Sequence, residues 1–472
     1  MHRGLMTSLI SLLIAASVLT VAAFSPAATA SFQMYSLSRP RPGPSSASAP
    51  SPIIAWEYDQ IQPAIAYSSQ ANLYLVVWED HHWGWGNDWD IYGRLVNAEG
   101  VPLGGSFGIS WVGEKHRLAP DVAYNSTARE FLVVWEYEYS ATDHDIYARR
   151  VQSDGSLVGA ELLVTNLTNW ESNPAIAYNA ADNEYLIVWE HLIEGRRHGI
   201  YGRRMSAGGV LLGDPIAIDT SSPWITALLT AYDALAPAVA YGSVSGQYLV
   251  VWQDKYPEKA DYDITGRRVG RDGALVGDEI SISTWEYDQV KPRLAFNSNA
   301  NEFLVLWEDH HWGWGADWDI YAQRVGGFGA LIGGNFGISW EGSEHRLNPT
   351  VGYKPLADEY LIAWEYEARE DDHDVYRRRV GRDGTLLEGE IVVSNLGSHE
   401  GQPALASDGG GAYLVVWEDG RDAATQGLNI YGDTVTTPSA TPTPTPTATR
   451  RATPTSTAVS YTHLRAHETV LD

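Results

Sequence analysis

The fold is decided by a stretch that begins at Tyr74-Leu75-Val76-Val77-Trp78-Glu79 and resumes, after a loop, at Asp90-Ile91-Tyr92-Gly93-Arg94. Its first part is apolar on both faces, as expected for a strand that lies between two layers. The pattern recurs with one or two departures in each copy, and its tryptophan falls at Trp78, Trp135, Trp189, Trp252, Trp307, Trp364 and Trp417. Spacings of 53 to 63 residues between these tryptophans indicate a repeat architecture of seven units.

Each unit reads as four short strands: one with a proline, one that ends near the tryptophan, one with the Asp-Ile-Tyr-x-Arg segment and one after a Gly-x-Leu turn. Four-stranded units that repeat radially form a β-propeller. The seventh unit lacks its fourth strand, and residues 53–59 match residues 282–288 at the end of the fourth unit. We therefore predict an all-β, seven-bladed β-propeller over residues 52–435. An N-terminal strand would complete the last blade and remove the exposed sheet edges.

The segments outside the repeats differ in composition. Residues 1–30 combine a positive start, an apolar run and the small-x-small site Ala28-Thr29-Ala30, which favours a cleaved secretory signal peptide over an uncleaved membrane anchor. Residues 31–51 form a Ser/Pro-rich spacer, and residues 436–458 a Thr/Pro-rich linker of the kind that tethers a secreted domain. Residues 459–472 resemble a translated sequencing-library adapter. We expect a secreted or cell-surface protein, tethered to a further domain or the cell surface, whose natural C-terminus is missing here.

Composition excludes several classes of protein. The chain has 59 Asp and Glu against 32 Lys and Arg, a formal net charge of −27, so we expect no nucleic-acid partner and no insertion into a membrane after signal removal. It has no cysteine, which excludes disulfides, cysteine-ligated zinc and thiol catalysis. Its aromatic residues are 19 Trp and 26 Tyr against 8 Phe, a bias towards rings that carry a polar group.

The repeat as it stands at 74–94 resembles that of loosely described secreted bacterial β-propellers. The resemblance covers about residues 52–435 and implies the fold without implying an activity. The Gly-His of WD repeats, the Ser-x-Asp-x-Gly-x-Thr-Trp box of sialidases and the Asp-x-Asp-x-Asp-Gly loops of integrin-type blades are absent from the sequence.

The candidate binding residues fall in one set of loops. In a propeller, the loops between second and third strands and those between consecutive blades emerge on the same face. Twelve tryptophans outside the second strands, and eleven histidines, lie in or beside these loops. Folding alone does not require this placement, which favours a binding face; the alternative is that the loops only cover the blade tops.

The sharpest motif is the loop from His81 to Asp90, which recurs from His310 to Asp319. Fourteen of the fifteen residues from Trp78 to Tyr92 are identical 229 positions later. The first three units therefore look like a duplicate of the last three, with the two loops about 206° apart around the ring. Tryptophan with nearby Asp and His suits a sugar, because rings stack on C–H faces while carboxylate and imidazole bind hydroxyls. The predicted ligand-binding residues are His81, His82, Trp83, Trp85, Asp88, Trp89, Trp111, His116, His310, His311, Trp312, Trp314, Asp317, Trp318, Trp340 and His345.

These patterns predict an extracellular propeller that recognises a glycan or another cell-surface ligand, with no catalytic residue assigned and no required cofactor. Two alternatives remain: a polysaccharide-active glycosidase or lyase, with acid–base groups in the segment 114–117, and a protein-binding surface scaffold. Asp-x-Asp pairs such as Asp88 and Asp90 are expected to pair with repeat arginines such as Arg94, with Ca²⁺ binding as the alternative. Metal binding by the His-His pairs is a further alternative, disfavoured because adjacent residues on an extended segment point apart and zinc would need more ligands.

Overall fold

The computed structural model describes residues 50–436, except 82–87, 168, 194–196, 220–232, 256–258, 260, 311–316 and 370–371. The predicted signal peptide, almost all of the spacer, nearly all of the linker and the adapter-like tail lie outside the described residues. The described strands form seven four-stranded antiparallel sheets, one for each predicted unit. The only helix in this part of the chain, α1 (Ala423–Gln426), is far too short to cross a bilayer.

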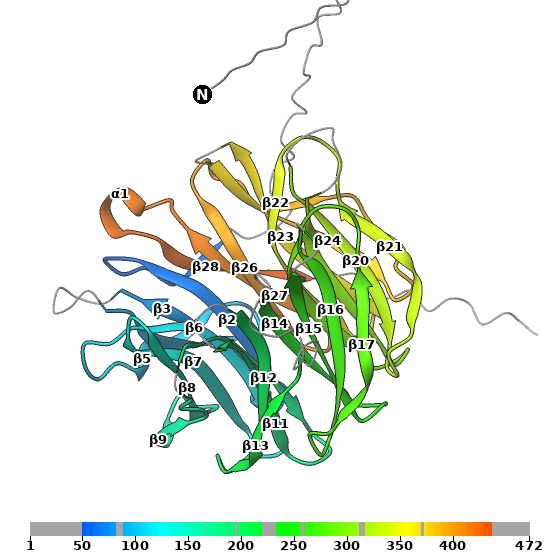
Figure 1. Ribbon diagram of the computed structural model, residues 1–472. Coiled ribbons are helices and arrows are strands. Elements are labelled where there is room, and N and C mark those ends of the chain that lie inside the picture. The colour runs from blue at the N-terminus through cyan, green and yellow to red at the C-terminus, as the bar shows by residue number, and fades with distance from the viewer. Residues whose placement is uncertain are drawn as a thin grey trace, which may run out of the picture. The chain divides into compact units, whose positions relative to one another are not determined.

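The seven sheets are the blades of a propeller, and successive blades follow one another in chain order around the ring (Figure 1). Blade one consists of β2 (Gln60–Ser68), β3 (Leu73–Asp80), β4 (Asp90–Asn97) and β5 (Pro102–Ser110). Blade two consists of β6 (Arg117–Asn125), β7 (Glu130–Ser140), β8 (Asp143–Gln152) and β9 (Leu157–Leu163). Blade three consists of β10 (Glu171–Asn179), β11 (Glu184–Ile193), β12 (Arg197–Ser206) and β13 (Leu211–Ala217). Blades four and five are β14 (Asp233–Gly242), β15 (Gln247–Lys255), β16 (Asp263–Gly270) and β17 (Leu275–Ser283); β18 (Gln289–Asn297), β19 (Glu302–Asp309), β20 (Asp319–Gly326) and β21 (Leu331–Ser339). Blades six and seven are β22 (His345–Lys354), β23 (Glu359–Arg369), β24 (Asp372–Gly381) and β25 (Ile391–Ser394); β26 (Glu400–Ser407), β27 (Ala412–Asp419), β28 (Asn429–Thr436) and β1 (Ser51–Ile54).

The predicted closure of the ring is confirmed. β1 pairs antiparallel with β28, with Ser51 opposite Gly432 and Ile54 opposite Ile430, so the N-terminal strand supplies the fourth strand of blade seven. In Figure 1 the blue start of the colour scale accordingly lies beside its orange end. The strand covers 51–54 rather than the predicted 53–59, because the chain turns into a loop at Ala55 and Trp56 before blade one begins.

The core lies between the blades. All seven repeat tryptophans are completely buried. Each packs against the preceding blade: Trp189 of blade three, for example, shares a cluster with Val134 and Ile146 of blade two. The second strand of each blade is apolar on both faces because each face contacts a neighbouring blade.

The repeated proline marks a bulge in the first strand of every blade. The residue before it has a left-handed backbone with φ between 47° and 53°, as at Gln62 and Asn173, and the strand register shifts there. In every blade its N–H donates to the acid or amide that follows the tryptophan of the preceding blade. The seven pairs, in blade order, are Gln62–Glu418, Ala119–Glu79, Asn173–Glu136, Ala236–Glu190, Lys291–Gln253, Asn348–Glu308 and Gln402–Glu365. The Trp-Glu segment of the repeat is thus a blade-to-blade latch.

The predicted pairing of Asp-x-Asp with the repeat arginines is wrong. Arg94 donates through Nη1 to the carbonyl of Ile53, 2.7 Å away in the fourth strand of the preceding blade, and Arg149 donates in the same way to Ile109. Four residues along a strand span roughly 13 Å, so the guanidinium of Arg94 cannot reach back along its own strand to Asp90. Arg267 and Arg378 likewise donate to carbonyls of the preceding blade, at Ile218 and Ile338, whereas Arg324 donates to Glu302 of its own blade.

Candidate functional site

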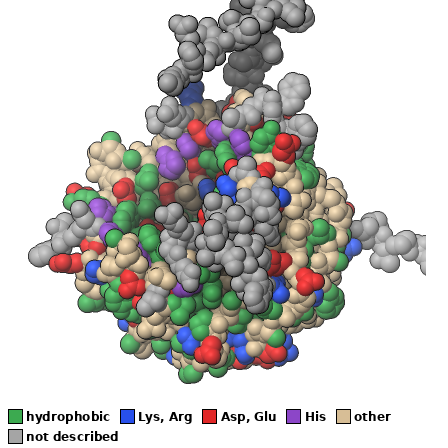
Figure 2. All heavy atoms as spheres, in the orientation of Figure 1, with side chains coloured by type: hydrophobic (Ala, Val, Ile, Leu, Met, Phe, Trp, Pro, Cys, Tyr) green, Lys and Arg blue, Asp and Glu red, His purple; other side chains and the backbone are tan. Residues whose placement is uncertain are grey.

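The described parts of the two duplicated loops form the same cluster twice. Six of the predicted residues, in two sets of three, lie outside the described residues: His82, Trp83, Trp85, His311, Trp312 and Trp314. The remaining ten are placed by the structure. Figure 2 shows histidine side chains gathered beside hydrophobic and acidic side chains on one face of the molecule.

At the centre of each cluster a histidine lies between two aromatic rings. The His81 ring is 6.0 Å from Tyr58, edge to face, and 4.9 Å from Trp89 at an angle of 31°. Its backbone N–H donates to the carbonyl of Asp59 at 2.9 Å. The second copy, made by Tyr287, His310 and Trp318, has ring separations of 6.1 and 4.9 Å. The described parts of the two loops are therefore equivalent, as their sequences predicted.

A buried arginine ties each aromatic cluster to the following interblade loop. The Arg117 backbone N–H donates to the carbonyl of Trp89 at 2.8 Å, and its guanidinium donates to Asp90 at 3.1 Å, Ser110 at 2.8 Å and the carbonyl of Val112. Its counterpart Arg346 makes the matching contacts in blade six, and the two side chains are 2% exposed or less. All of these hydrogen bonds give Arg117 a structural role, so it does not serve in the acid–base group that the sequence predicted for the segment 114–117.

The positive charge of the arginine and burial have opposite effects on the pKa values of Asp90 and Asp319. Burial raises the pKa of Asp90 to about 7, although the positive charge of Arg117 lowers it. The same balance raises the pKa of Asp319 to about 7. Asp88 and Asp317 lie beside these groups, half-buried, at the edge of each cluster.

Two tryptophans present exposed rings next to these arginine-held loops. Trp111 is 44% exposed and Trp340 is 41% exposed, the highest values among the described tryptophans. Each ring packs on a glycine of the same blade, Gly108 or Gly337, where any Cβ atom would collide with it. Each ring is therefore held against a glycine while a large part of it remains exposed, and the Arg149 guanidinium lies 5.9 Å from the centre of the Trp111 ring.

The predicted histidines are not all on the surface. His116 and His345 are half-buried beside the clusters, and Nδ1 of His345 accepts the backbone N–H of Trp318 at 3.1 Å. In contrast, His144 is only 3% exposed and its Nδ1 lies 2.5 Å from Glu136, and His191 is paired with Glu171 at 2.8 Å. The sequence predicted that these histidines lie in or beside the loops, but His144 lies in β8 and His191 in β11, and both turn inward to a carboxylate.

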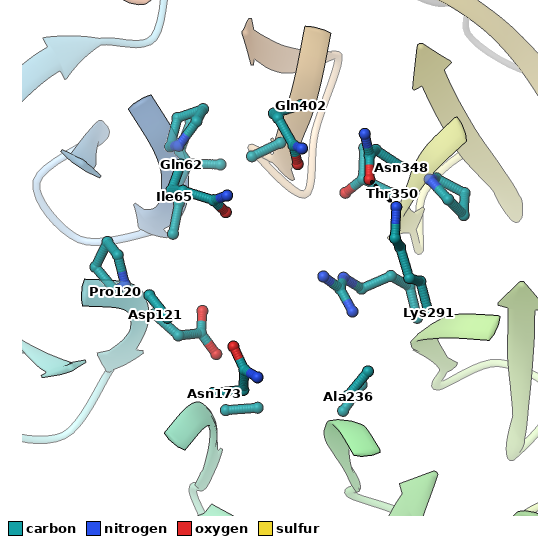
Figure 3. Close-up of a pocket in the computed structure, with 18 of the residues that line it drawn as sticks. Gln62, Ile65, Pro120, Asp121, Asn173, Ala236, Lys291, Asn348, Thr350 and Gln402 are labelled. Atoms are coloured by element: carbon teal, nitrogen blue, oxygen red, sulfur yellow. Dashed lines mark hydrogen bonds between the residues drawn. The ribbon is translucent and has the colours of Figure 1, made fainter. Parts of the chain in front are cut away.

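A cavity of about 610 Å³ lies where the seven first strands converge. It is lined by the proline bulges of all seven blades, and Figure 3 shows Asp121, Lys291 and Asn348 directed into it from different blades. Four of the seven positions after the repeat proline are alanine, and the other three are Asp121, Arg293 and Thr350 in blades two, five and six. Burial raises the pKa of Asp121 to about 6, against the lowering effect of hydrogen bonds from Ile176 and Val122. Sequence reasoning missed this polar channel, although the departures from alanine in an otherwise regular repeat were visible.

No protein-family model matches the chain, and no curated protein matches it. Solved structures with a similar fold include a protein of unknown function from Dyadobacter fermentans, 13% identical, which covers 69% of this chain and 95% of its own with a TM-score of 0.47. An α-L-arabinofuranosidase from Fusarium graminearum is 9% identical over 82% of this chain and 98% of its own, with a TM-score of 0.48. A Hadza microbial sialidase is 10% identical over 74% and 73%, with a TM-score of 0.46. Likenesses this weak carry no inference about function.

Proposed function

We propose that the protein is an extracellular binding propeller that recognises carbohydrate through two equivalent aromatic clusters. The observation that carries this proposal is the repetition of one arrangement in blades one and five, with an exposed tryptophan at Trp111 and at Trp340. Sugars offer a flat C–H face to such rings and hydroxyls to neighbouring imidazole and carboxylate groups.

Preorganisation supports binding at these clusters. Trp111 packs on Gly108, and the loop that carries it is held by Arg117, so little side-chain freedom is left to lose when a ligand arrives. Exposed tyrosines, Tyr58 and Tyr287 at 42% each, extend the apolar surface beside His81 and His310. Two such clusters on one rigid ring favour a multivalent glycan, because the second contact becomes intramolecular.

The central channel fits this proposal better than it fits glycoside hydrolysis. Retaining and inverting glycosidases use a pair of carboxyl groups on either side of the scissile bond. Among the described residues that line the channel, Asp121 is the one carboxyl group, and its two oxygens accept backbone N–H groups from Val122 and Ile176. This engagement suits a structural role for Asp121.

A glycan array tests the proposal, run on the wild-type protein with and without Ca²⁺. We expect binding to at least one class of polysaccharide, and loss of that binding when Trp111 and Trp340 are both replaced by alanine. Phe328→Ala is the matched control, because Phe328 is 65% exposed in the turn between β20 and β21, away from both clusters. Binding to a protein partner but to no glycan would contradict the proposal and select the scaffold alternative.

A further inference from the structure

A group of side chains that the proposed function does not use lies between blades six and seven. Glu365 is on β23, His373 is near the start of β24, and His399 immediately precedes β26. Each offers one ligand atom, and the three atoms lie within 4.8 Å of one another. We propose that Glu365, His373 and His399 bind a divalent transition-metal ion of the zinc class, independently of any carbohydrate.

The donor set has the chemistry of such a site. Imidazole nitrogens with one carboxylate oxygen suit Zn²⁺ and its neighbours, whereas Ca²⁺ prefers an all-oxygen shell of six to eight ligands. The Glu365 side chain is 4% exposed, His373 is 15% exposed and His399 is 34% exposed. The Glu365 carboxylate is thus buried. His399, whose Nε2 lies 3.8 Å from the buried Glu418, is the most exposed of the three ligands and leaves an entry path for the ion.

The ligands are also held in position. One oxygen of Glu365, Oε2, accepts the backbone N–H of Gln402 at 3.0 Å and the side-chain amide of Asn348 at 2.8 Å. Its other oxygen, Oε1, faces Nδ1 of His373 at 2.5 Å. A parallel bridge joins the backbones of His373 and His399, and their rings are 4.9 Å apart. These contacts fix the orientation of the Glu365 carboxylate and of the His373 ring before any ion binds.

Gly401 keeps the space beside these ligands open. A Cβ atom at this position would lie 2.7 Å from Oε2 of Glu365 and 2.7 Å from Nε2 of His399. Any larger residue would therefore displace one of the two ligands.

The duplicated half of the chain supplies a natural comparison. In blade two, Glu136 and His144 repeat the pair with the same 2.5 Å contact, but Trp170 stands at the position of His399. The Trp170 ring stacks on His144 at 4.1 Å and its Nε1 donates to Glu136 at 3.2 Å. Ser172 likewise stands at the position of Gly401. Compared with the first half of the chain, the second half thus has His399 as an additional ligand and Gly401 as an opening beside it. These two differences lie two residues apart, at the start of blade seven.

The proposal is tested on the intact protein after a chelator has removed any bound metal. Zinc is then titrated into the protein and followed by calorimetry, and the zinc that remains bound after dialysis is measured. The double substitution His399→Trp with Gly401→Ser copies the arrangement that blade two already tolerates, so the fold should survive. We expect it to remove one equivalent of tightly bound zinc, weakening this site by about a hundredfold or more. The reverse change, Trp170→His with Ser172→Gly, should add one equivalent.

Equal zinc content in the wild type and in the His399→Trp, Gly401→Ser variant would overturn the proposal, because any bound zinc would then belong to other histidines. An excess of Ca²⁺ that displaces the zinc would also contradict it. His399→Gln, which is smaller and keeps a polar group, serves as a second variant if the double substitution does not fold. Thermal unfolding of each variant in the presence of chelator separates loss of the metal from loss of the fold.

Discussion

The blade-to-blade latch can be tested by replacing Glu79 with glutamine. Glu79 is 5% exposed and accepts the backbone N–H of Ala119, in the next blade, at 2.6 Å. Burial raises the pKa of Glu79 to about 8 from an ordinary 4.5, and the nearby Glu136 and Glu418 raise it further against the lowering effect of the Ala119 hydrogen bond. Gln253 already fills the same position in blade four, where it accepts the N–H of Lys291 at 2.9 Å. Glutamine is therefore compatible with the latch and imitates the protonated acid.

The sign of the pH dependence follows from this raised pKa. Between pH 4.5 and about 8 the folded protein keeps a proton that the unfolded chain releases, so the stability that the protonated carboxyl contributes is complete below about pH 4.5 and is lost as the pH rises through about 8. The difference between these pKa values, at 1.36 kcal/mol for each pH unit, sets an upper limit of about 5 kcal/mol. Relaxation and water penetration around a buried charge reduce such penalties, and we expect about 1–3 kcal/mol to remain.

Urea unfolding of the wild type and of Glu79→Gln at pH 5, 7 and 9 measures the effect. The two proteins should be nearly equal at pH 5, and the variant should be more stable by about 1–3 kcal/mol at pH 9. Glu99→Gln, at an exposed position in a turn, is the control and should show no such widening. A difference that does not change with pH, or a variant that is less stable at pH 9, would refute the reasoning.

Three further predictions concern the framework. Replacing Trp189, which is completely buried, with alanine should lower the free energy of unfolding by about 3–5 kcal/mol; a loss below about 1 kcal/mol would show that the ring is not in the interblade core. Deleting residues 51–54 should expose the edge of β28, lower the melting temperature and promote association, whereas a monomer of unchanged melting temperature would contradict ring closure by β1. Arg346→Met should cost about 3–5 kcal/mol because it leaves the buried Asp319 without its cation. Arg382→Met, at an exposed pair with Asp358, should cost less than about 1 kcal/mol, and equal losses in the two variants would refute the distinction.

The fold could be predicted from the sequence because its repeat consists of the apolar strands and tryptophans that form the buried core. Trp78 and its six equivalents lie in strands that are apolar on both faces. The match of residues 53–59 with residues 282–288 located the start of the closing strand within two residues, although the strand ends at Ile54 and not at 59. Periodicity could not reveal the partners of polar groups across blades. The acceptor of Arg94 is a carbonyl 41 residues earlier, and the donor to Glu79 is an N–H 40 residues later.

The candidate site was predictable in part for the same reason. The near-identity of the two loops implied two equivalent clusters, and the described rings around His81 and His310 agree with that expectation. The sequence could not separate the half-buried His116 from His144, which the register of β7 and β8 turns towards the buried Glu136. The sequence nevertheless indicated a structural role for the acid to which His144 turns. An acid follows the repeat tryptophan in six of the seven units, and Gln253 replaces it in the other. A group repeated so regularly serves every blade and is better read as structural.

The central claim, that the two clusters are complete and equivalent carbohydrate sites, is tested most directly by the stoichiometry of binding. Calorimetric titration with a monovalent sugar identified on the array should give two sites per chain for the wild type. Trp111→Ala and Trp340→Ala should each leave one site of unchanged affinity, and the double variant should leave none, while the melting temperature stays within the range expected for exposed rings. Loss of all binding in either single variant would mean one shared site, and wild-type binding in the double variant would mean that these rings take no part in recognition.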